Sequence, residues 1–150
     1  NIAFADFLSP GLSKDALAAY RENFAPSAFA ARPHAAVALV ALAAETEDEA
    51  RRLDATRQAW AYEMAKGRFW PFPKAEEAAD ILAMIGSDPV LEQIRGRAIV
   101  GTGALVRQQI TRLAKDAKAD EVLLMTFTCE AAARFNSYKL IADAFAAVPA

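Results

Sequence analysis

The strongest constraint on the fold is an apolar run of ten residues, Ala35–Ala44, in which hydrophobic and polar residues do not alternate. A strand with one face in water alternates, whereas a strand covered on both faces, as in a parallel sheet, reads as a continuous apolar run. Thr46 follows directly, with Glu49 three residues later, which is the pattern of a capping box at a helix start. A buried strand that leads into a capped helix is one βα unit, so the sequence predicts an α/β fold.

Other segments extend this alternation. Residues 2–7 (IAFADF) are predicted to form a short strand before a helix capped by Ser13, and residues 121–128 (EVLLMTFT) a second buried strand. Residues 98–101 are too short to assign and are predicted to form either a minimal strand or a buried loop. Helices are expected from Thr46 to Gly67, after Thr102, and over residues 130–147. Their inward faces are predicted to carry Ala50, Leu53, Trp60 and Met64 in the first and Tyr138, Ile141 and Phe145 in the last.

Residues 67–101 interrupt the pattern and are predicted to be a helical and loop insertion within a single domain of residues 1–150. Two prolines in residues 68–74 (RFWPFPK) exclude a helix or a central strand there, and three large aromatic side chains must pack on apolar surface. Two short helices follow, over residues 74–85 and Pro89–Arg95, separated by Gly86.

Composition limits the function. The net charge of -2 gives no electrostatic reason to expect nucleic acid or an acidic membrane as a partner. One cysteine, Cys129, excludes an internal disulfide framework and fits a reducing compartment. No apolar run approaches the roughly 20 residues that span a bilayer, and no signal peptide is recognised, so a cytoplasmic location is expected. The chain starts at Asn1 and is strand-like at once, which suggests a protein cut at its front.

Parallel strands with crossover helices form either an open doubly wound sheet or a closed barrel. The only glycine-rich turn, Gly101-Thr102-Gly103, lacks the third glycine and the later acidic residue of a dinucleotide-binding loop, so a turn with a helix cap is the favoured interpretation. A barrel needs about 250 residues, and three or four βα units would be roughly half of one.

Several pieces, spread over nearly the whole chain, resemble the C-terminal part of the luciferase-like flavin monooxygenases. They are residues 2–7 (IAFADF), 20–27 (YRENFAPS), Arg32-Pro33, 43–53 (AAETEDEARRL), 99–102 (IVGT), 118–126 (KADEVLLMT) and 134–142 (RFNSYKLIA). Each piece has a plain structural role alone, and their order and spacing carry the resemblance.

The resemblance implies an eight-stranded α/β barrel of which residues 2–7, Ala35–Ala44 and 121–128 are strands six, seven and eight. Residues 67–101 fall where the family has its long insertion, and residues 99–102 belong to that excursion. The implied activity uses reduced FMN and dioxygen on a small organic substrate, with a flavin reductase as a possible partner. Most of the FMN site would lie on the first five strands, which this chain lacks. Gly103 replaces the family's usual proline, and Asp6-Phe7-Leu8 stands where aromatic or histidine residues are common.

Active sites of such barrels lie at the C-terminal ends of the strands. The predicted substrate- or cofactor-facing wall is therefore Asp6, Phe7, Ala44, Glu45, Thr126 and Thr128, while Trp70 and Phe72 could form a lid. For each of these a structural role is also open: a core side chain for Phe7, a solvated charge for Asp6 and Glu45, and satisfied hydroxyls for Thr126 and Thr128. The catalytic residues themselves are not identified.

The other residues with potentially reactive side chains are assigned structural roles. His34 precedes a strand, at the end opposite the chemistry, and Cys129 has no paired histidine, so both are expected to be structural. One histidine and one cysteine do not make a zinc site, and no metal is expected.

Two alternatives remain open. One is a deazaflavin-dependent oxidoreductase on the same barrel. The other is a non-enzymatic α/β module that dimerises through its open sheet edge. The chain is expected to form a homo-oligomer or to associate with the missing half-barrel.

Overall fold

A computed structural model describes residues 4–7 and 13–147, and these form two compact units. Unit 1 comprises the described residues up to 39 together with residues 108–125, and unit 2 comprises residues 40–107 and 126–147. One strand, β2 (Ala35–Ala44), runs from the first unit into the second. Each unit is described by itself.

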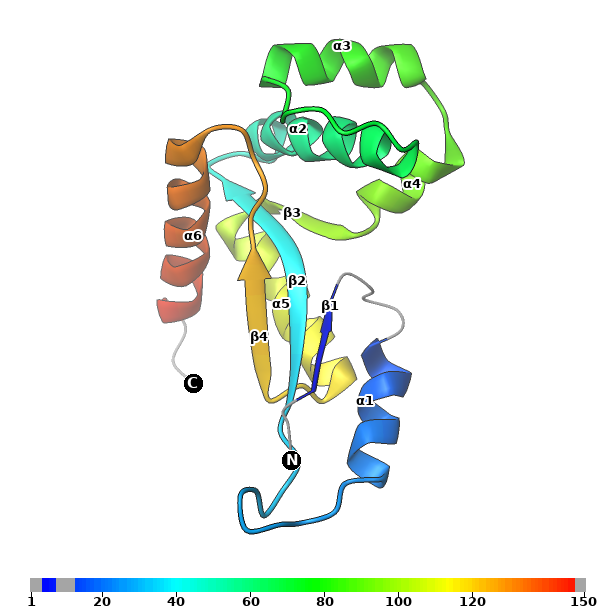
Figure 1. The fold of residues 1–150 in the computed structure, drawn as a ribbon. Helices are drawn as coiled ribbons and strands as arrows, with labels where there is room; N and C mark the ends of the chain where they lie inside the picture. Colours follow the sequence, from blue (N-terminus) through cyan, green and yellow to red (C-terminus); the bar gives the residue numbers. More distant parts are fainter. Residues whose placement is uncertain (1–3, 8–12, 148–150) are drawn as a thin grey trace. The chain divides into compact units, whose positions relative to one another are not determined.

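In unit 1, the first half of β2 is paired with two strands. β1 (Phe4–Phe7) pairs with it in parallel, from Phe4 opposite Ala35 to Phe7 opposite Ala38. β4 (Glu121–Met125) also pairs with β2, and Figure 1 shows its arrow pointing the same way. The helix α1 (Ser13–Glu22) buries Leu17 completely. This arrangement is a small parallel sheet, as the apolar run predicts.

The start of β2 is fixed by one carboxylate. Asp120 accepts a hydrogen bond from the backbone N–H of Ala35 at 2.8 Å and another from Arg21 at 2.8 Å. The backbone N–H of Asp120 donates in turn to the carbonyl of Ala35 at 2.8 Å. His34 lies 3.2 Å from Glu121 beside these groups, and both side chains are more than half exposed. His34 therefore lies next to the amino-terminal ends of β2 and β4.

In unit 2, the second half of β2 pairs in parallel with β3 (Ala98–Thr102), from Val40 opposite Ala98 to Ala44 opposite Thr102. The sequence left this segment as a minimal strand or a buried loop, and it is a five-residue strand. Buried side chains from β2 and from the helix after it form a core against Val100 and Ala133: Leu42, Ala44, Ala50 and Leu53. The helices of this unit are α2 (Glu47–Ala65), α3 (Ala75–Ile85), α4 (Pro89–Arg95), the first turn of α5 (Gly103–Ala117) and α6 (Ala131–Ala146).

Helix α2 begins and ends where the sequence predicts. The Thr46 side chain accepts a hydrogen bond from the backbone N–H of Glu49 at 3.2 Å. At the other end, Gly67 has φ +77°, a left-handed conformation that glycine adopts without steric cost. Gly67 N–H donates to the carbonyl of Met64 and Arg68 N–H to that of Glu63, both at 2.9 Å. These two bonds are a Schellman motif, which satisfies carbonyls at the helix end and sets the direction of the following loop.

A buried ion pair joins α2 to α4. Arg57 donates to both carboxylate oxygens of Asp54, at 2.6 and 3.0 Å, and both side chains are at most 6% exposed. The third guanidinium nitrogen donates to the carbonyl of Ile94, the next-to-last residue of α4, at 3.1 Å. A buried charge is costly unless it is paired and hydrogen-bonded, so loss of either side chain would leave the other charge buried without a partner. The pair therefore holds α4 on α2.

The sequence prediction is wrong at three places. β4 ends at Met125, so Thr126 and Thr128 follow the strand instead of sharing one of its faces, and Leu123 within it is 46% exposed. Met64 is 38% exposed because the buried face of α2 ends at Tyr62. In α6 only Ile141 of the three predicted residues is buried, whereas Tyr138 and Phe145 are 38% and 41% exposed. An apolar sequence pattern indicates which side chains can be buried. It does not indicate which other element packs on them.

The double-sided burial of β2 makes a direct prediction. Every residue of β2 except Ala38 is buried, and Val40 is only 4% exposed. Val40→Asp places a carboxylate without a partner in the core and should lower the free energy of unfolding by about 3 kcal/mol or more. Leu123→Asp in the half-exposed strand β4 is the matched control and should cost far less. Urea unfolding of the two variants measures the difference, and equal losses would contradict burial on both faces.

Candidate functional site

Two side-chain hydroxyls take over the hydrogen bonding of β2 beyond the end of β4. The Thr126 hydroxyl donates to the carbonyl of Ala41 at 2.7 Å, and the Ser137 hydroxyl accepts from the backbone N–H of Ala43 at 2.9 Å. The backbone N–H of Thr126 donates to the Tyr138 hydroxyl at 3.1 Å, so it is not available to a strand ladder. This is why the strand stops before Thr126. These contacts give Thr126 and Tyr138 structural roles and attach α6 to β2.

Thr128 differs from Thr126. Its hydroxyl oxygen is buried and has no hydrogen-bond partner among the described residues. Buried polar atoms are nearly always paired, so an orphaned one at the C-terminal side of a strand is a candidate ligand contact. The two residues that follow Thr128 have ordinary surroundings. Cys129 is a free, half-buried thiol, and Glu130 lies 4.0 Å from Arg52 in an exposed ion pair.

An aromatic cluster lies beside this residue. The ring of Phe127 is nearly parallel to those of Trp60 on α2 and Phe72 in the loop, at centroid distances of 6.2 and 6.3 Å. Trp60 and Phe72 are stacked at 4.5 Å. The predicted lid residue Phe72 is therefore anchored to α2 and to the segment after β4, and the loop that carries it is held against both.

The other strand-end residues take ordinary positions. Ala44 is 2% exposed and belongs to the core. Glu45 is exposed, and its negative charge contributes to the raised pKa of Lys139, whose main cause is the hydrogen bond to Asp143. Asp6 and Phe7 lie in β1 of unit 1, opposite Val37 and Ala38, and their side chains lie outside the described part of the structure.

The turn Gly101-Thr102-Gly103 is filled by protein. A Cβ at Gly103 would lie 2.6 Å from the carbonyl oxygen of Leu140 in α6, and one at Gly101 would lie 2.6 Å from the Leu105 side chain. The Thr102 hydroxyl accepts from the Leu105 N–H at 3.4 Å. The glycines thus allow close packing of α5 on α6, which agrees with a turn and cap, and leave no cradle for a phosphate at these two positions.

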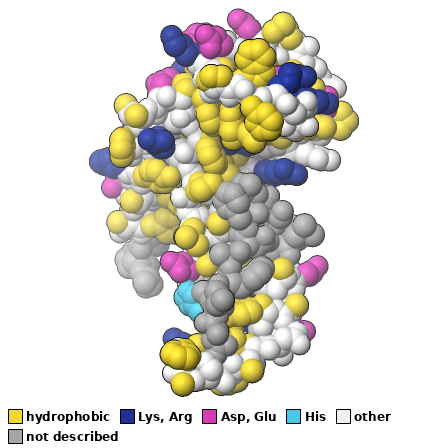
Figure 2. Space-filling view, in the orientation of Figure 1, with side chains coloured by type: hydrophobic (Ala, Val, Ile, Leu, Met, Phe, Trp, Pro, Cys, Tyr) yellow, Lys and Arg dark blue, Asp and Glu magenta, His cyan; other side chains and the backbone are white. Residues whose placement is uncertain are grey.

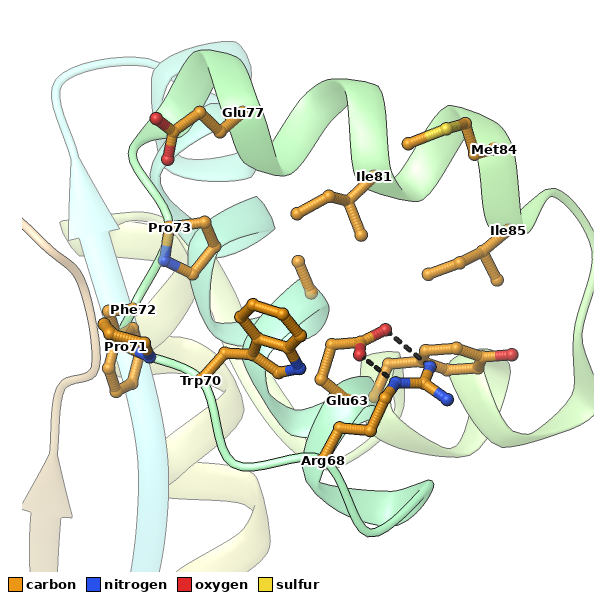
Figure 3. A pocket seen from close by; sticks show the side chains of 12 residues that line it. Glu63, Arg68, Trp70, Pro71, Phe72, Pro73, Glu77, Ile81, Met84 and Ile85 are labelled. Atoms are coloured by element: carbon orange, nitrogen blue, oxygen red, sulfur yellow. Dashed lines mark hydrogen bonds and ion pairs between the residues drawn. The ribbon is translucent and has the colours of Figure 1, made fainter.

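A groove of about 670 Å³ lies between α2, α3 and the loop that joins them (Figure 3). Ile81 and Ile85 descend into it from α3, and Trp70 rises from the loop on the opposite side. The second predicted lid residue, Trp70, is 62% exposed here. Trp70 lines the groove together with Phe72, so the loop forms one wall of this groove.

The polar groups at this groove are paired with one another. Arg68 donates to both carboxylate oxygens of Glu63, and these bonds lower the pKa of Glu63 and raise that of Arg68. The Tyr62 hydroxyl donates to Asp88 at 2.7 Å, which raises the pKa of Tyr62 and lowers that of Asp88. Each shift favours the protonation state that the hydrogen bond needs, so these pairs hold their charges near neutral pH.

No group of three or more potential metal-ligating side chains occurs within residues 4–7 and 13–147. Over the same residues, no helix is long and apolar enough to cross a membrane.

Comparison with known proteins shows what the chain resembles. No protein-family model matches the chain. It is 27% identical over 141 residues to a luciferase-like monooxygenase of Escherichia coli K12, and 30% identical over 142 residues to the uncharacterised Bacillus subtilis protein YvbT. Each alignment covers 94% of this chain and 42% of the relative. Its structure matches that of apo-MsnO8 with a TM-score of 0.87 at 28% identity, over 99% of this chain and 46% of that one.

The resemblance to the luciferase-like monooxygenases is confirmed. The same fold also occurs, at 20% identity and a TM-score of 0.58, in the oxygenating constituent of 3,6-diketocamphane monooxygenase from Pseudomonas putida, solved in complex with FMN. The predicted fold class is confirmed by these matches, since the small parallel sheet covers a part of such luciferase-like structures. The chain spans less than half the length of these relatives.

Sequence reasoning missed two contributors to the region after β4. Ser137 is fully buried and bonds to β2, and its signal was a lone small hydroxyl one helical turn before the buried Ile141. Trp60 was assigned to the core stripe of α2, and its stacking on Phe72 and Phe127 has no signal in local sequence because the three rings come from distant segments.

The two threonines after β4 should respond in opposite ways to loss of the hydroxyl. Thr126→Val leaves the Ala41 carbonyl without a partner and should cost about 1–3 kcal/mol. Thr128→Val removes an unpaired buried hydroxyl and should leave stability unchanged or raise it by up to about 1 kcal/mol. Urea unfolding under identical conditions compares them. A comparable loss in both variants would mean that Thr128 has a structural hydrogen bond of its own.

Proposed function

We propose that this chain supplies part of the substrate-facing wall of a flavin-dependent monooxygenase that acts with reduced FMN and dioxygen on a small organic substrate. The similarity to luciferase-like monooxygenases over 94% of the chain carries the proposal. The whole enzyme's substrate, and a flavin reductase that would provide the reduced cofactor, are parts of the same proposal.

The residues after β4 fit a wall better than a phosphate anchor. The unpartnered hydroxyl of Thr128 supports a polar contact to cofactor or substrate. The glycine turn before α5 is occupied by α6, which argues against a phosphate site at those glycines. A flavin phosphate is typically held by backbone N–H groups and helix N-termini, so that anchor is assigned to the portion of the relatives that this chain does not cover.

Bound reduced flavin would supply the electrons that activate dioxygen, and the protein's task is then to orient the substrate and exclude water. The Thr128 hydroxyl would donate a hydrogen bond to an acceptor atom of the ligand, or accept one from a donor atom. Phe127, held in the cluster with Trp60 and Phe72, would give an apolar surface at that point. Asp6, Phe7 and Glu45 remain candidate contacts from the other strand ends, and Trp70 with Phe72 a candidate lid.

Flavin titration tests the assignment. The 150-residue chain alone should show no measurable FMN binding. The chain should also be fused to the segment of a luciferase-like relative that has no counterpart in these 150 residues. This joined protein should quench flavin fluorescence saturably. In the joined protein, Phe7→Ala and Thr128→Val should weaken flavin or substrate binding by about fivefold or more, a loss of roughly 1 kcal/mol.

The matched controls are His34→Ala and Cys129→Ala, which should change binding less than about twofold. Tight FMN binding to the 150-residue chain alone would overturn the assignment of the anchor to the uncovered portion. Absence of binding in the joined protein would remove the flavin assignment itself.

Assembly state gives a second test. Large apolar side chains are exposed in both units, among them Phe29 at 95%, Phe135 at 69% and Leu123 at 46%. Exposed apolar surface and open strand edges promote association. We therefore expect the 150-residue chain to form dimers or larger species in sedimentation velocity, and the joined protein to do so less. A monodisperse monomer with a sharp two-state unfolding transition would count against the partial barrel.

A further inference from the structure

The groove between α2 and α3 has the properties of a small-molecule site. Its volume of about 670 Å³ lies within the roughly 300–1,000 Å³ of ligand pockets. Most of its lining is apolar or aromatic, and on the face drawn in Figure 2 hydrophobic side chains gather over the region where Figure 1 shows α2 and α3. Trp70 and Met84 are 62% and 80% exposed.

The loop wall of the groove is fixed in place without a ligand. At its start, the Schellman motif and the bidentate Glu63–Arg68 pair hold residue 68 against the end of α2. Two residues past Trp70, the ring of Phe72 is stacked on Trp60. At its end, Glu77 accepts a hydrogen bond from the backbone N–H of Lys74 at 3.1 Å. A preformed wall removes part of the ordering cost of binding.

The polar groups decide the charge of the ligand. Glu63 is paired with Arg68, Glu77 with the Lys74 backbone, and the Tyr62 hydroxyl with Asp88. An anionic ligand would have to draw Arg68 away from Glu63, or be desolvated beside the carboxylate of Glu77, which keeps its negative charge, and both are costly. An uncharged ligand leaves them intact and gains from apolar contact.

We propose that this groove binds an uncharged, largely apolar small molecule whose aromatic ring lies against the indole of Trp70. Apolar contacts come from Ile81, Ile85 and Met84 on α3, and the paired Glu63 and Arg68 border the site. Trp70 is also a candidate lid residue in the proposed function, but the inference does not rest on the flavin assignment, because α2, α3 and the loop between them form the groove by themselves.

Two matched fluorescent probes test the proposal on the 150-residue chain without flavin. N-phenyl-1-naphthylamine is neutral, and 8-anilinonaphthalene-1-sulfonate is an anion with the same aromatic core. The neutral probe should bind saturably and about tenfold more tightly than the anionic one. Equal affinity for both probes, or no saturable binding of the neutral one, would overturn the proposal.

Adjacent exposed aromatics provide the variant control. Trp70→Ala should weaken binding of the neutral probe by about tenfold, because it removes the ring contact. Phe69→Ala removes a neighbouring ring that is 81% exposed and does not line the groove, and should change binding less than about twofold. Met84→Gln, on the opposite wall, should weaken binding about threefold. Circular dichroism checks that all three variants are folded.

Two further outcomes would overturn the proposal. Equal losses for Trp70→Ala and Phe69→Ala would indicate adsorption to apolar surface in general. A probe signal per molecule that falls as protein concentration rises tenfold would indicate that a second copy of the chain covers the groove. A signal independent of concentration supports the small-molecule site.

Discussion

The burial of β2 on both faces is the constraint on which the rest of the structure depends. Each of the other strands in the described part of the chain pairs with β2, β1 and β4 through its first half and β3 through its second. A strand without a wet face must have its backbone groups paired and both its faces covered. Where β4 ends, that requirement is met by Thr126 and Ser137, so the hydroxyl cluster is a consequence of how β2 is completed.

The same constraint separates structural from functional candidates. The Thr126 hydroxyl donates a hydrogen bond to β2, so its position needs no ligand to account for it. Thr128, in contrast, has a buried hydroxyl that makes no hydrogen bond to any described residue. The flanking Phe127 is stacked with rings from α2 and the insertion loop. The insertion is thereby connected to the region after β4 through Phe72, and its own groove is lined by residues from the C-terminal part of α2. The likeness to luciferase-like monooxygenases supports the proposed flavin chemistry, and these contacts indicate which side chains are free to take part in it.

Much of the fold could be predicted from sequence because its signals are local. The apolar run of β2, the Thr46 cap and the Gly67 helix end each depend on neighbouring residues, and the structure confirms them. The candidate site was less predictable. The strand-end rule selected Thr126 and Thr128 together, and only the contact with Ala41 distinguishes them. Tyr138 was predicted to face inward, yet it is 38% exposed, and its hydroxyl accepts a hydrogen bond from the backbone N–H of Thr126.

The sequence by itself determined the α/β class, the order of elements, and the likeness to luciferase-like monooxygenases, because periodicity, capping and motif order are properties of contiguous residues. Tertiary structure alone decided that β4 stops at Met125, that Asp54 and Arg57 form a buried pair reaching α4, and that Trp60, Phe72 and Phe127 stack. Asp54 and Arg57 are only three residues apart, but the bond from Arg57 to Ile94 and the ring contacts with Phe127 join residues separated by tens of positions. Their energy comes from burial and geometry that exist only once the segments have met, so no local pattern encodes them.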